Sequence, residues 1–170
     1  YLTKPINMDE LTYLASDCVR RFDEARKDSF EDREDLLRKL LMYEVNDSGL
    51  ITEMEHDYCM VLIFESADSG RLMAEAAGHM REQGAYVLVQ REDLCEIAVI
   101  APTRMTVEMR ASLFLSHTRQ LFSEQGMSLT CAQSNVQWGI RLLDQCYQEA
   151  HEALKLKYIR GDNQNLRFQD

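Results

Sequence analysis

The chain has 170 residues, of which 45% are hydrophobic and 28% charged, so it is neither a disordered chain nor a small disulfide-stapled domain. Its net charge of -10 disfavours direct binding to a nucleic-acid backbone. The longest apolar stretch, residues 58–64, is far shorter than the ~20 residues needed to cross a bilayer. Five cysteines without CxxC spacing favour reduced core thiols. We therefore expect a cytoplasmic protein that contacts no membrane and holds no metal or other cofactor.

The first predicted helix begins after Pro5, with Asn7 as its candidate N-cap. Apolar residues then recur at alternating spacings of three and four, as in a helix that pairs with another helix. They are Met8, Leu11, Ala15, Cys18, Phe22 and Ala25. Ser29, followed by Asp32, predicts the start of a second helix. We predict two helices before the main domain and a boundary between residues 46 and 47.

The remaining pattern alternates strands with helices. Strands are predicted at 58–64, 86–90, 95–101, 127–132 and 165–168, and helices at 69–83, 106–125 and 140–158. Asp68 or Ser69 is a candidate cap for the first of these helices. Mixed ordering of this kind favours an α+β domain with helices packed on a largely antiparallel sheet.

Both ends of the chain resemble parts of known regulators. The opening YLTKPI is similar to the end of a two-component receiver domain, and Lys4 and Pro5 match its lysine-proline pair. Residues 142–168 resemble the last helix of a degenerate cyclase-like domain found in bacterial transcription regulators. The matching residues are Tyr147, Glu149, Ala150, Ala153, Leu154 and Gly161. Response regulators of the AraC type contain both features in this order.

A third comparison concerns the predicted hairpin, where active diguanylate cyclases carry a GG[DE]EF turn. The equivalent residues here are Asp93, Leu94, Cys95, Glu96 and Ile97. Glycines in that motif admit nucleotide phosphates and its acidic residues position metal ions, which Leu94 and Cys95 cannot do. The resemblance therefore implies a nucleotide-cyclase-like, GGDEF-like domain with a ferredoxin-like core, a degenerate motif and no catalytic activity.

The resemblance also implies an organisation and a set of partners. Residues 1–46 would be the end of a receiver domain and a coiled-coil-like signalling linker, and residues 47–170 the degenerate central domain. We expect a homodimer, with a seam formed by Met8, Leu11, Ala15, Cys18 and Phe22. A sensor histidine kinase would act through receiver residues before residue 1. DNA would be bound only by a helix-turn-helix domain beyond residue 170.

Two other functions stay open at this stage. One is an active nucleotide cyclase with the same fold, and the other is a domain that senses a small ligand. Trp138 could stack on such a ligand, or it could pack the start of the last helix onto the sheet.

Overall fold

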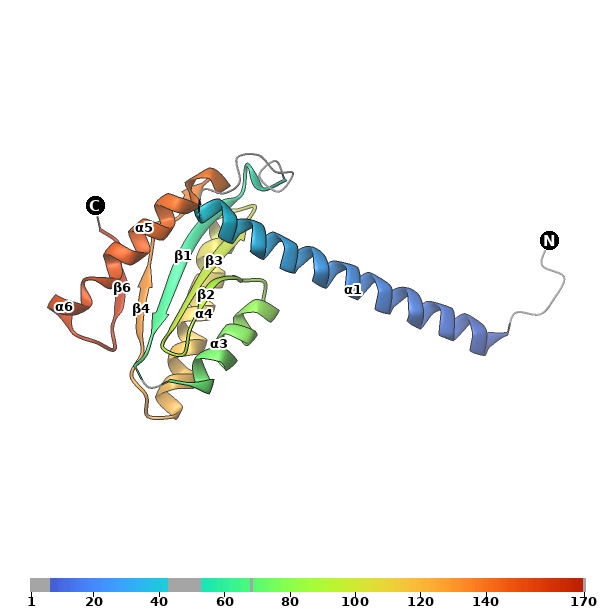
Figure 1. Cartoon of the computed structure of the whole chain (residues 1–170), viewed down its shortest axis with the longest axis horizontal. Coiled ribbons are helices and arrows are strands. Elements are labelled where there is room, and N and C mark those ends of the chain that lie inside the picture. The colour runs from blue at the N-terminus through green and yellow to red at the C-terminus, as the bar shows by residue number, and fades with distance from the viewer. Residues whose placement is uncertain (1–6, 43–52, 68, 170) are drawn as a thin grey trace.

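The computed structural model describes residues 7–42, 53–67 and 69–169, and for residues 22–29 it describes the backbone alone. A long helix, α1 (Met8–Leu41), extends from a domain built on one sheet (Figure 1). The strands are β1 (Tyr58–Glu65), β2 (Tyr86–Gln90), β3 (Leu94–Ala101), β4 (Thr130–Gln133), β5 (Gln137–Trp138) and β6 (Asn165–Arg167). The other helices are α3 (Arg71–Glu82), α4 (Arg104–Glu124), η1 (Ile140–Leu142), α5 (Leu143–Leu154) and α6 (Lys157–Arg160).

The sheet has the strand order β2-β3-β1-β4-β6, and β5 pairs with one end of β1. Neighbouring strands run antiparallel except β4 and β6, which are parallel. The predicted α+β class with a mostly antiparallel sheet and packed helices is confirmed. The predicted strands at 86–90 and 95–101 agree with β2 and β3 to within one residue.

Side-chain alternation divides the core into two layers, one on each face of the sheet. On one face, Phe64 and Ile97 pack against α3 and α4. On the other face, Val61 and Ile63 pack against α5 and the last turns of α1, where Leu37 is fully buried. The end of α1 is therefore part of the domain core, while its beginning projects away from it (Figure 1).

The helix α1 corrects the prediction of two helices, because it runs without a break through Ser29 and Asp32. Serine and aspartate inside a helix each cost well under about 1 kcal/mol relative to alanine. A break would instead leave unpaired N–H and C=O groups at two new helix ends. The predicted cap at Asn7 is confirmed, since its Oδ1 accepts a hydrogen bond of 3.0 Å from the amide of Asp9.

Two further predictions need correction. Ser69 does not cap α3, because its hydroxyl donates to the carbonyl of Glu92 at 2.7 Å and Gly70 precedes the helix instead. The helix predicted at 140–158 is divided into η1, α5 and α6. The predicted boundary between residues 46 and 47 lies outside the described residues, as does Asp68. Among the helices described, none is long and apolar enough to cross a membrane.

Candidate functional site

A buried carboxylate attaches α1 to the sheet domain. Glu34 is only 4% exposed, and both of its oxygens are paired. Oε1 accepts from Arg38 Nη2 at 2.6 Å and from Arg81 Nη2 at 2.7 Å, and Oε2 accepts from Arg81 Nε at 3.1 Å. The hydrogen bond to Glu34 raises the pKa of Arg81 above its ordinary value. Because Arg81 belongs to α3, this network joins two helices that are distant in sequence.

The same network covers the open edge of β2. The amide of Val87 donates to Glu34 Oε2 at 3.1 Å, and its carbonyl accepts from Arg38 Nε at 3.1 Å and Arg38 Nη2 at 2.8 Å. Val87 adjoins the irregularity in the pairing of β2 with β3. Edge strands with free N–H and C=O groups invite pairing with other chains. The side chains of α1 therefore take the place of a further strand at this edge.

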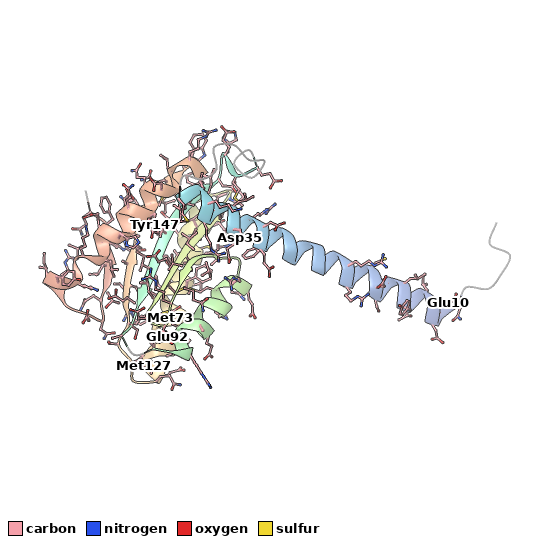
Figure 2. All side chains as sticks on the ribbon, in the orientation of Figure 1. Glu10, Asp35, Met73, Glu92, Met127 and Tyr147 are labelled. Carbon is pink, nitrogen blue, oxygen red and sulfur yellow. The ribbon has the colours of Figure 1, made fainter. Side chains whose placement is uncertain are left out.

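The outer half of α1 has no such support. Its side chains from residue 8 to 21 stand free of the domain, as those around Glu10 show (Figure 2). The large apolar side chains Met8, Leu11, Tyr13, Leu14 and Val19 are between 49% and 71% exposed. The predicted seam residues Ala15 and Cys18 are exposed too, whereas the side chain of Phe22 lies outside the described residues. This half of the helix consequently carries an apolar stripe that nothing in the described chain covers.

The residues aligned with the cyclase motif lie at the turn between β2 and β3 and in the first half of β3. Asp93 is exposed at that turn, while Leu94 begins β3 and is half-buried. Cys95 and Ile97 point into the core on the α3 and α4 side, and burial raises the pKa of the Cys95 thiol to about 12. The turn is tied to the loop after β1, because the Ser66 amide donates to the Asp93 carbonyl at 2.9 Å.

Glu96 points to the opposite face and lies beneath α5. Its Oε1 is 2.8 Å from His151 Nε2, while its Oε2 has no hydrogen-bond partner among the described residues. The ring of Tyr147 lies beside that of His151, with centroids 4.5 Å apart. Burial, with a smaller effect of the Glu96 carboxylate, raises the pKa of Tyr147 to about 12. The one acidic residue that fits the cyclase motif thus packs against α5 instead of facing the turn.

The other carboxylates near the turn are either paired or exposed. Glu65, at the end of β1, is paired with Lys157 Nζ of α6 at 2.6 Å. Glu92 and Asp93 are exposed on the turn itself. Within the described residues, no group of three or more His, Cys, Asp or Glu side chains is placed to hold a metal ion.

Several residues in these contacts were not predicted from the sequence, and one prediction cannot be compared. Glu34, Arg38 and Arg81 form the helix anchor, although only the Glu34 and Arg38 spacing of four is visible in the sequence. Lys4 and Pro5 lie outside the described residues. Trp138 is 56% exposed, and its ring stacks on that of His56 with centroids 5.6 Å apart.

Comparison of the chain with models of known protein families finds no match, and comparison with curated proteins finds none either.

Replacing Glu34 with Gln should weaken the attachment of α1. Glutamine keeps the shape but leaves Arg38 and Arg81 without their shared negative charge, so we expect the free energy of unfolding to fall by about 1–3 kcal/mol. Chemical denaturation followed by circular dichroism measures this. Asp35→Asn is the matched control, because Asp35 pairs with Arg38 in an exposed position. That variant should change stability by no more than about 0.5 kcal/mol. Equal losses in both variants would contradict the assigned role of Glu34.

The raised pKa of Tyr147 predicts a signature at alkaline pH. Absorbance at 295 nm should show one tyrosine ionising near pH 12 in the folded chain, and Tyr147→Phe should remove that step. Between the ordinary tyrosine pKa of about 10 and this value, the unfolded state binds fewer protons than the folded state. The tyrosine therefore makes stability fall as pH rises through that window, and the fall should be shallower in Tyr147→Phe. Identical absorbance titrations of the wild-type chain and Tyr147→Phe would contradict the raised pKa assigned to Tyr147.

Proposed function

We propose that this chain is the central signal-relay and dimerisation region of a bacterial two-component response regulator that controls transcription. In this proposal the region is catalytically inactive, and it passes a change in helix packing from a receiver domain to a DNA-binding domain. Both of those domains would lie outside the 170 residues of this sequence. The partner of the region would be a second copy of itself, and a sensor histidine kinase would act on the receiver. DNA would be contacted only by the further domain, in the cytoplasm.

The observation that carries the proposal is the continuity of α1. One helix of 34 residues, about 50 Å long, includes both the exposed apolar stripe and the buried anchor at Glu34 and Leu37. An interruption at Ser29 would have separated the two halves mechanically. Because the helix is unbroken, a rotation or shift of its outer half acts on the β2 edge through Arg38 and on α3 through Arg81.

The exposed stripe supports pairing with a second copy. Isolated helical segments of this length gain most of their stability from packing an apolar face. Positions 8, 11, 15, 18, 22 and 25 follow the heptad spacing that places residues along one seam. Leu14 and Val19 flank it and widen the apolar surface. The small side chains of Ala15 and Cys18 keep this seam weak, and a weak seam can be shifted by coupling free energies of about 1–3 kcal/mol.

The sheet supports a cyclase-like ancestry for the domain. The order β2-β3-β1-β4 with α3 and α4 as crossover helices is the arrangement expected of a βαββαβ, ferredoxin-like core. Its inactivity is supported by the placement of the carboxylates, since Glu96 packs beneath α5 and Glu65 pairs with Lys157. The Ser69 bond to Glu92 closes the loop after β1 onto the hairpin turn.

The double variant Leu11→Asp, Phe22→Asp should convert a dimer into a monomer, because it places charges at a d and an a position of the seam. Sedimentation velocity over a range of protein concentrations measures the change. Tyr13→Asp is the matched control, since Tyr13 is 71% exposed and lies off the heptad seam. It should leave the dimer intact. A wild-type chain that sediments as a monomer, or a double variant that stays dimeric, would contradict the proposal.

Cys18 gives a second readout that also reports helix direction. In a parallel pair, the two Cys18 side chains would face each other at a d position, so mild oxidation should produce a crosslinked dimer on a non-reducing gel. Cys18→Ser should abolish the crosslink, because the other four cysteines are buried. An antiparallel pair would dimerise without forming this crosslink.

The inactive state of the domain is tested separately. Incubation of the chain with GTP and Mg²⁺ or Mn²⁺ should yield no cyclic nucleotide, because Glu96 is buried beneath α5 and Glu65 is paired with Lys157, so neither carboxylate is free to hold a metal ion at the turn. Product analysis by chromatography gives the answer. Turnover that disappears in Glu96→Gln would show an active cyclase and would overturn this part of the proposal while leaving the dimer seam untouched.

A further inference from the structure

A groove between α3 and α4 carries an unusual combination of side chains. It encloses about 520 Å³ and is lined by His79, Gln83, Arg110, Leu113, Phe114 and His117. His79 and His117 come from different helices, and their rings stack with centroids 4.1 Å apart. Leu113 and Phe114 supply an apolar wall beside them. The groove therefore offers hydrogen-bond donors and an apolar surface in one place.

Arg110 differs from every other half-buried arginine or lysine in the described part of the protein. Five such residues have partners: Arg33, Arg38, Arg81, Arg119 and Lys157. Arg110 is half-buried too, yet it forms neither a hydrogen bond nor an ion pair with any described residue. Its guanidinium lies against Gly84, where an added Cβ would be 3.8 Å from Nη1. A partly desolvated cation without a counter-charge is unfavourable until an anion pairs with it.

The groove that contains Arg110 offers it no counter-charge. None of the residues lining the groove is acidic, although the chain has 29 Asp and Glu residues. The groove near Arg104 differs, because it includes Glu108, which pairs with Arg104 at 3.0 Å. Arg119, on the same helix α4, is also occupied, since its guanidinium donates to Asn163, Asn165 and the carbonyl of Leu129.

We propose that the groove between α3 and α4 binds a small organic anion. Arg110 holds the carboxylate or phosphate of the ligand by charge-assisted hydrogen bonds, and the two imidazoles add donors. Leu113 and Phe114 contact the apolar body. This inference does not depend on dimerisation or on the assignment to a response regulator, because it rests on the unpaired Arg110 and the shape of the groove.

The test is isothermal titration of the full chain with three probes at neutral pH: benzoate, phenyl phosphate and inorganic phosphate. We expect saturable binding of at least one of the two organic anions. If the groove prefers a phosphate ester to a carboxylate, phenyl phosphate should bind about tenfold more tightly than inorganic phosphate, because only phenyl phosphate has a ring that contacts the apolar wall. A preference for benzoate would identify a carboxylate, and a preference for phenyl phosphate would identify a phosphate ester.

Variants locate the binding site. Arg110→Gln should weaken binding by about tenfold or more, whereas Arg104→Gln, on the same helix and outside the groove, should leave it unchanged. Proton NMR should show the ring resonances of His79 and His117 shifting during the titration while that of His56 stays constant. His117→Ala is a second variant at an exposed position of the groove, and it should also weaken binding while leaving the fold intact. No saturable binding of either organic anion, or equal affinity in Arg110→Gln, would overturn the inference.

Discussion

The buried carboxylate of Glu34 is the contact on which the architecture depends. It lies where α1, α3 and the edge of β2 meet, and it offers acceptors to a guanidinium from each helix and to the amide of Val87. A buried ion pair is weak grounds for high stability, because desolvation offsets much of the attraction. Its geometry is nevertheless specific, since both oxygens are engaged. This contact therefore fixes where α1 crosses the domain more than it determines how stable the domain is.

That specificity matters for a helix that projects from its domain. Leu37 is buried in the core, and Phe30 stacks on Tyr86 with ring centroids 4.7 Å apart, but apolar contacts alone tolerate sliding and rotation. The hydrogen bonds of Glu34 and Arg38 to Val87 allow one register only. A movement of the outer half of α1 consequently has to break these bonds or carry the β2 edge with it. Either response is the discrete kind of change that the proposed signal relay would need.

The sequence predicted the elements of the sheet better than it predicted the helices or their contacts. The strands β2 and β3 agreed with their predicted ranges because β3 is buried on both faces of the sheet and β2 along most of its length, so each appears in the sequence as a short, mostly apolar run. The supposed helix start at Ser29 was wrong because a capping pattern is worth about 1 kcal/mol and is outweighed by the cost of opening a helix. The helix anchor could not be predicted, since Glu34, Arg81 and Val87 meet only after the chain has folded around the sheet. The stacking of His79 on His117 could not be predicted for the same reason, because the two residues are distant in sequence and lie on different helices.

Helix α3 connects the anchor of α1 with the groove that contains Arg110. Arg81 extends from α3 to Glu34, whereas His79, two residues earlier, lines the groove. Residues two apart lie on nearly opposite sides of a helix, so α3 separates the two regions by a single helix diameter. An anion that pulled α4 and α3 together through Arg110 and the two histidines would shift the side of α3 that carries Arg81. Because Glu34 accepts bonds from Arg81 and from Val87 at once, such a shift would change the position of α1 that the domain prefers. Ligand binding in the groove and the geometry of the proposed dimer would then shift the same conformational equilibrium. By thermodynamic linkage, the factor by which the ligand changes the preference for one dimer geometry equals the factor by which that geometry changes the affinity for the ligand.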